Sequence, residues 1–176
     1  MTEVAPQHIV VMGVSGCGKT TVAEGLAASL AWPFAEGDRF HPQANIDKMA
    51  ARIPLTDEDR WPWLRILADW ITEHERSGRS TVMSCSALKK SYRDVLRSGG
   101  RRVRFVHLHG DRAILTGRLE ARAGHFFPAD LLDSQYAALE PLAGDEDGFV
   151  VDIALDPEAQ IKEALRSLGL TRGASL

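Results

Sequence analysis

A glycine-rich motif near the start of the chain constrains its fold more than any other feature. The motif fits the pattern G-x4-G-K-S/T and reads Gly13-Val14-Ser15-Gly16-Cys17-Gly18-Lys19-Thr20. It follows segment 8–12, whose apolar run is typical of a strand buried on both faces, and precedes segment 19–30, where apolar residues repeat every four positions as in a helix. Between such a strand and helix, glycines let backbone N–H groups converge on an anion. The sequence therefore predicts a P-loop that binds nucleotide phosphates.

The residue types of this loop suit ATP and Mg²⁺. Lys19 supplies a mobile positive charge for the β- and γ-phosphates, and the Thr20 hydroxyl can bind Mg²⁺. The residues expected to bind ATP in the loop are Gly13, Val14, Ser15, Gly16, Cys17, Gly18, Lys19, Thr20 and Thr21.

Cys17 raises a separate hypothesis. A helix N-terminus and a neighbouring lysine both favour a thiolate, so we expect the pKa of Cys17 to be lowered and the thiol to react with alkylating agents. Bound ATP would then protect it. The alternative is a thiol that packs between helix and sheet and stays inert.

Apolar runs alternate with helical patterns along the rest of the chain, which predicts an α/β fold with parallel strands. The expected strands are 8–12, 33–35, 80–84, 103–108 and 149–153. The expected helices are 19–30, a short one opened by Pro42 and closed by Pro54, 57–77, 89–96, 111–122, 129–139 and 157–168. With 176 residues we expect one domain spanning residues 1–176, with a frayed tail at 171–176.

Composition excludes several classes of protein. The net charge of −3 argues against nucleic acid as a partner. The sequence has no apolar run long enough for a membrane span, and its acidic start does not resemble a signal peptide. The two cysteines do not suggest a disulfide framework, so we expect a cytoplasmic protein.

A second set of polar residues stands where the acceptor of a kinase would bind. Glu36 and Asp38 follow the expected second strand, at the sheet edge where open α/β sheets bind ligands. A carboxylate there can orient an acceptor hydroxyl and take its proton. The alternative is that Asp38 caps the helix at Pro42.

Cationic residues complete the candidate site. Arg118 and Arg122 lie one helical turn apart, so one could stack on a base while the other reaches the transferring phosphate; the alternative is two solvated arginines. We interpret Lys89 and Arg93 as ligands of an anion. His107 and His109 share one side of a strand, but no third ligand lies near in sequence, so zinc is not expected.

A P-loop alone leaves open a small-molecule kinase, a GTPase switch and an ATP-binding module without catalysis. Residues 86–89 look like the guanine-side loop of small GTPases, but the partner motif N-K-x-D is missing. This excludes the GTPase, and the other two classes remain.

Longer motifs resemble the thermoresistant gluconokinase family. They cover Met12–Lys19, Gly37–Pro42, Asn45–Met49, Pro54–Leu64, Cys85–Asp94, Arg118–Phe127 and Leu139–Pro141. The resemblance implies a P-loop NTPase fold like that of nucleoside monophosphate kinases, with a five-stranded parallel sheet in the order 2-3-1-4-5 flanked by helices, and a small lid at about 122–135. It also implies a homodimer and the phosphorylation of D-gluconate by ATP. A kinase for another small acid or a nucleotide is the alternative; shikimate is disfavoured, because the glycine-triplet motif of shikimate kinases is absent.

The resemblance also implies roles for individual residues. Lys19, Asp38 and Arg122 would be catalytic, with Asp38 orienting the hydroxyl and Arg122 neutralising charge in the transition state. Arg118 would cover the adenine. Thr20, with Glu36 acting through a water, would hold Mg²⁺. The substrate would be bound by Asp38, His41, Lys48, Arg52, Ser86, Lys89, Arg93 and Gln135.

Overall fold

The computed structural model describes residues 4–123 and 129–173, with the side chains of 122, 123, 129 and 130 left out of the description. Its centre is a five-stranded parallel sheet. The strands are β1 (His8–Met12), β2 (Phe34–Glu36), β3 (Thr81–Ser84), β4 (Val103–His109) and β5 (Gly148–Asp152). Their order is β2-β3-β1-β4-β5, and all four pairings are parallel. The expected α/β fold and the strand order are confirmed.

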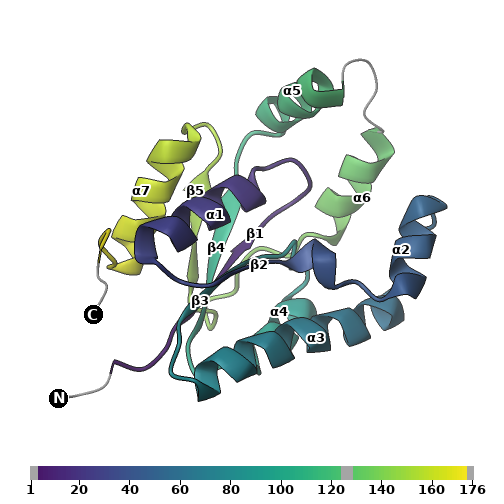
Figure 1. Ribbon diagram of the computed structural model, residues 1–176. Coiled ribbons are helices and arrows are strands. Elements are labelled where there is room, and N and C mark those ends of the chain that lie inside the picture. Colours follow the sequence, from purple (N-terminus) through teal and green to yellow (C-terminus); the bar gives the residue numbers. More distant parts are fainter. Residues whose placement is uncertain (1–3, 124–128, 174–176) are drawn as a thin grey trace.

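Helices cover both faces of the sheet (Figure 1). On one face lie α1 (Lys19–Leu30) and α7 (Pro157–Leu168), and on the other α3 (Asp57–Arg76) and α4 (Lys90–Arg97). The side chains of β1 alternate between them: Ile9 and Val11 join the core with α1 and α7, and Val10 and Met12 join the core with α3 and α4. This is why the central strand is apolar on both sides.

Three further helices and a short 3-10 helix stand toward the carboxyl ends of the strands. They are η1 (Gly37–Phe40), α2 (Gln43–Ala50), α5 (Arg112–Ala123) and α6 (Ala129–Ala138). Figure 1 shows α5 and α6 on the side of the sheet where the loop between β1 and α1 lies. None of the helices within the described ranges is both long and apolar enough to cross a membrane.

Local signals set the helix ends. The Thr56 hydroxyl accepts a hydrogen bond from Asp59 N (3.2 Å), and the Asp59 carboxylate accepts one from Thr56 N (2.9 Å), so a capping box starts α3 where it was expected. Asp156 caps α7, which ends at Gly169 in the left-handed conformation. Lys89 has an extended backbone and precedes α4, which begins one residue later than expected.

Several boundaries differ from expectation, and β5, at Gly148–Asp152, begins and ends one residue earlier than expected. β2 is displaced by one residue, so Glu36 is its last residue, and η1 follows it directly. Near the end of the chain, Gly173 N donates to Ser29 O (3.2 Å), so the backbone is still bonded to α1 beyond the point where fraying was expected to begin.

His107 is an unusual residue in the core. It lies on β4 between Met12 of β1 and Val150 of β5, and its side chain is 3% exposed. Neither ring nitrogen has a hydrogen-bond partner among the described residues. Burial, together with the charges of His109 and Arg93, lowers the pKa of His107 to about 4.

We expect His107 to destabilise the fold in acid. Between pH 6.5 and pH 4 the unfolded chain takes up a proton on this residue that the folded chain does not, so the free energy of unfolding falls by roughly 2–3 kcal/mol as the pH falls. Urea unfolding curves at pH 7 and pH 4 measure the fall in the free energy of unfolding. In His107→Leu this fall should be smaller by about that amount, whereas in His109→Leu it should equal that of the wild type. If the free energy of unfolding falls as much in His107→Leu as in the wild type, His107 is not the source of the destabilisation in acid.

Candidate active site

The P-loop leaves the carboxyl end of β1 at Gly13. This residue has φ 146°, and a Cβ there would lie 2.7 Å from both Leu108 O and Cys17 Sγ, so a side chain does not fit. Gly13 N donates to Ser86 O (3.3 Å), which holds the loop against the end of β3. Gly16 and Gly18 also have positive φ, and Gly18 starts α1. The backbone therefore has the conformation that an anion-binding loop requires.

Glu36 connects the P-loop to β3. Its carboxylate accepts hydrogen bonds from the Thr20 hydroxyl (2.5 Å) and the Ser84 hydroxyl (2.7 Å). These oxygen ligands fit a hard cation such as Mg²⁺. Among the described residues no group of three or more His, Cys, Asp and Glu side chains could hold a metal, so a cation here would depend on phosphate oxygens as well. Lys19 Nζ donates to Val14 O (3.0 Å), within the same loop.

Asp38 lies two residues beyond Glu36, in η1, and is exposed. The helix α2 begins after Pro42 without a side-chain cap, which argues against the capping interpretation of Asp38. Asp38 is therefore an exposed carboxylate two residues from Glu36, whose own carboxylate binds Thr20 of the P-loop.

His41 is held beside Asp38 by α3. The indole of Trp63 stacks on its ring at 4.1 Å between centroids and donates to Gly37 O (2.9 Å). The amide of Asn45 lies 3.2 Å from His41 Nδ1 and 3.0 Å from Asp59 O. Burial lowers the pKa of His41, and the Asp38 charge opposes this shift. The stacking and the amide contact therefore fix the orientation of the His41 ring near Asp38.

Two of the expected substrate-binding residues, Lys48 and Lys89, are paired with the first turn of α3. Lys48 Nζ lies 2.9 and 2.8 Å from the Asp59 oxygens, and these bonds lower the pKa of Asp59 to about 2. Lys89 Nζ lies 3.1 Å from Asp57, whose pKa is lowered by hydrogen bonds from Tyr92 and Lys89. Both lysines are partly exposed. They remain able to meet a ligand, as does the exposed Arg52.

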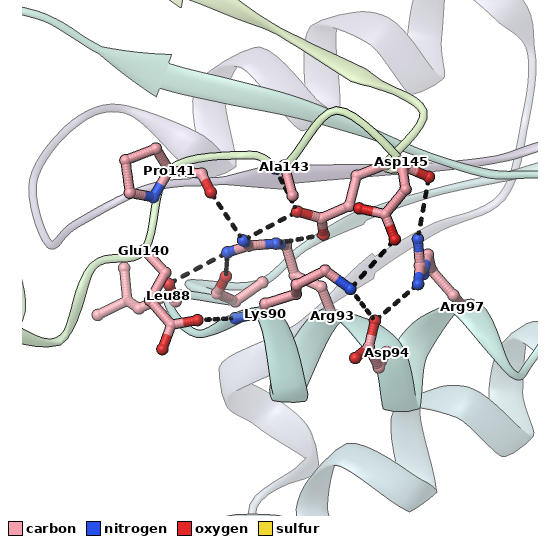
Figure 2. Close-up of polar contacts among 11 residues, drawn as sticks. Leu88, Lys90, Arg93, Asp94, Arg97, Glu140, Pro141, Ala143 and Asp145 are labelled. Carbon is pink, nitrogen blue, oxygen red and sulfur yellow. Dashed lines mark hydrogen bonds and ion pairs between the residues drawn. The ribbon is translucent and has the colours of Figure 1, made fainter.

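Arg93 does not have the position expected of a substrate ligand (Figure 2). It is 0% exposed, and all its N–H groups are bonded within the protein. It forms a two-pronged ion pair with Glu146, at 2.7 and 3.1 Å, and donates to the carbonyls of Ala87, Leu88 and Pro141. The expectation that Arg93 binds substrate is therefore corrected, because no donor is left for it.

Gln135 lies nearer the nucleotide side than expected. From α6 its Oε1 accepts from Ser15 N (2.5 Å) and its Nε2 donates to Ser15 Oγ (2.6 Å). Ser86 is half-buried, with its carbonyl bonded to Gly13. Both residues thus border the P-loop.

Of the two arginines of α5 that were expected at the site, the structure describes the side chain of one. Arg118 donates to Ile153 O (2.6 Å), just after β5, and its neighbour Leu119 packs against Gly16 of the P-loop. This places Arg118 beside the nucleotide loop. The side chain of Arg122, and residues 124–128 of the expected lid, lie outside the described residues.

Cys17 does not behave as the sequence suggested. Its side chain is 2% exposed and belongs to the core with α1 and α7. Burial raises the pKa of the Cys17 thiol in spite of the nearby Lys19. The structure therefore supports the alternative of a thiol packed between helix and sheet.

Several residues that position the site were missed. Ser84 donates a hydrogen bond to Glu36, and Glu146 forms an ion pair with Arg93. Trp63 stacks on the ring of His41, and the amide of Asn45 contacts the same ring. Ser84 could have been found as the last residue of an apolar strand, where parallel sheets place ligands. The sequence has no comparable signal for Glu146, which stands 53 positions from its partner.

Comparison with known proteins agrees with this geometry. Residues 9–142 match the AAA domain family. The chain is 48% identical to a gluconokinase of Gluconobacter oxydans, over 92% of this chain and 90% of the relative. It is 47% identical to the thermoresistant gluconokinase of Escherichia coli, over 83% and 85%. A solved gluconokinase from Sinorhizobium meliloti superposes with a TM-score of 0.83 at 46% identity, over 94% of this chain and 93% of that one. The chain therefore belongs to the gluconokinase family of P-loop kinases.

Proposed function

We propose that the protein transfers the γ-phosphoryl group of ATP to D-gluconate, giving ADP and 6-phospho-D-gluconate. The observation that carries the proposal is the run Glu36-Gly37-Asp38 at the end of β2. Its first carboxylate binds the P-loop hydroxyl of Thr20, and its second lies two residues further toward the acceptor side. One short segment thus links the nucleotide loop to the group that would receive the proton. The gluconokinase relatives support the choice of substrate.

On the nucleotide side, the P-loop amides and Lys19 would bind the phosphates, and Arg118 would cover the adenine. Mg²⁺ would be held by Thr20, with Glu36 acting through a water, and would neutralise charge on the phosphates. The Thr20–Glu36 hydrogen bond supports this assignment because it fixes the hydroxyl oxygen. Lys19 would exchange its bond to Val14 O for phosphate.

On the acceptor side, Asp38 would orient the attacking hydroxyl and accept its proton. Arg122 would neutralise charge in the transition state. The polyol and carboxylate of gluconate would be bound by Asp38 together with His41, Lys48, Arg52, Ser86, Lys89 and Gln135. The pairing of Lys48 and Lys89 with acids of α3 supports this role, since it holds both ammonium groups in place before the ligand arrives.

Three features of the natural protein complete the proposal. The cytoplasm is its proposed compartment, and the two cysteines, both buried and free, suit a reducing environment. A homodimer is proposed on the family resemblance. Residues 1–176 are proposed to form one kinase domain with a lid at about 122–135.

The first test is turnover on a panel of sugar acids and nucleoside monophosphates in a coupled ADP assay. We expect steady ADP release with gluconate and none without an acceptor.

Lys19→Ala should abolish this ADP release with an unchanged melting temperature, because the Lys19 charge serves the phosphates and not the core. Lys162→Ala, on the exposed side of α7, is the matched control. Turnover with another acid alone would indicate a different kinase, and ATP binding without turnover would indicate a regulatory module.

The second test concerns Asp38. Asp38→Asn keeps the shape of the side chain but removes the charge that accepts a proton, so kcat should fall about 10²–10⁴-fold while ATP affinity stays within twofold. Steady-state kinetics and ATP titration measure the two effects. Asp69→Asn, exposed on α3, should leave both unchanged. A normal kcat in Asp38→Asn would remove the proton-accepting role.

A further inference from the structure

The buried pair Arg93–Glu146 joins two segments that lie far apart in the sequence (Figure 2). We call residues 85–89, which follow β3 and carry Ser86 and Lys89, the acceptor loop. Residues 139–146, which lead from α6 to β5, are the lid root. Arg93 donates to two carbonyls of the acceptor loop and to the carbonyl of Pro141 in the lid root, while Glu146 also accepts from Ala143 N (2.8 Å).

Further bonds join the same two segments. Glu140 N donates to Leu88 O (2.8 Å), and the Glu140 carboxylate accepts from Lys90 N (2.7 Å), the first residue of α4. Lys90 Nζ lies 3.4 Å from Asp145 in the lid root. These bonds join the acceptor loop, the first residue of α4 and the lid root, which would therefore move as one body.

Each segment also reaches the P-loop. The acceptor loop does so through Ser86 O, which accepts from Gly13 N. The lid root does so through α6: Leu139 N donates to Gln135 O (2.9 Å), and the Gln135 side chain holds Ser15 by two hydrogen bonds. The contacts form a closed ring that runs from the P-loop through the acceptor loop, Arg93–Glu146 and the lid root back to Ser15.

Stability alone does not account for this pair. Both side chains are 0% exposed, and a fully buried ion pair often contributes no more to stability than apolar residues of similar size. The pair does, however, fix the position of the backbone in the acceptor loop. Arg93 binds the carbonyl of Ala87, a non-glycine residue held at φ 45°, directly after Ser86.

We propose that Arg93 and Glu146 are positioning residues that make the binding of nucleotide and acceptor interdependent. The inference rests on the proposed function. Phosphates that bind the P-loop would shift the positions of Ser15 and Gln135. The lid root and the acceptor loop, which are bonded to each other, would pass this shift on to Ser86 and Lys89. If bound nucleotide strengthens the binding of gluconate by some factor, gluconate must strengthen the binding of nucleotide by the same factor, because the two binding free energies are linked.

The test is the thermodynamic coupling between the two ligands. Calorimetric titration would give the Kd of gluconate with and without a non-hydrolysable ATP analogue and Mg²⁺. In the wild type we expect gluconate to bind at least about fivefold tighter with the analogue present. In the double variant Arg93→Met with Glu146→Leu, both ligands should still bind alone, but the ratio of the two Kd values should fall to within twofold of one.

Two further variants separate positioning from stability. Arg104→Met removes another buried arginine, which bonds to Asp147, the residue after Glu146, and to Leu168 O. None of these bonds reaches the acceptor loop or the P-loop, so the substitution should lower the melting temperature and leave the ratio unchanged. If the double variant does not fold, Arg93→Lys serves instead: it keeps the buried charge but cannot make all five bonds, and the ratio should again fall.

Three results would overturn the proposal. They are a wild-type ratio near one, an unchanged ratio in the Arg93 variants, and an equal fall of the ratio in Arg104→Met. A wild type that phosphorylates gluconate without coupling would leave the proposed function intact. A wild type that neither binds nor phosphorylates gluconate would overturn both.

Discussion

The close approach of the backbone at Gly13 is the constraint on which the rest of the structure depends. β1 is the central strand, buried on both faces, and its last residue is followed by a position where a Cβ would lie 2.7 Å from Leu108 O. Only glycine allows the chain to leave the sheet here and point its amides toward an anion. Because neighbouring parallel strands end at the same edge, the ends of β2 and β3 then lie beside the loop. Glu36 and Ser84 occupy those ends.

Local features of the site could be predicted from the sequence, and features that depend on distant partners could not. The P-loop is encoded by adjacent residues, so its place between β1 and α1 followed from spacing alone. The strand order came only from family resemblance, since alternating patterns do not fix which strands are neighbours. Arg93 shows the limit most clearly. A cation near the end of a strand suits an anion ligand or a structural ion pair equally well, and only the fold reveals Glu146 beside it.

Cys17 shows how two physical effects compete at one position. The helix N-terminus and Lys19 favour the thiolate, and both can be recognised in the sequence. Burial opposes them and prevails, because the side chain turns away from the phosphate side toward the core that contains α1 and α7. The direction of a side chain in a loop with several positive φ values depends on those angles, which the glycine spacing does not specify. The error was therefore one of orientation and not of electrostatics.

The first turn of α3 serves the fold and the site at once. Asp59 completes the capping box with Thr56 and also binds Lys48, and Asp57, the first residue of the helix, binds Lys89 and Tyr92 of the α4 region. Acids are favoured at this position by the helix dipole even without a site. Here the same carboxylates pair with two partly exposed ammonium groups, those of Lys48 and Lys89, which we propose as substrate ligands. Such pairing lowers the conformational entropy that these long side chains would lose on meeting a ligand. The acids at the start of α3 thus serve both the helix and the proposed acceptor site: Asp59 through its cap with Thr56 and its pair with Lys48, and Asp57 through its pair with Lys89.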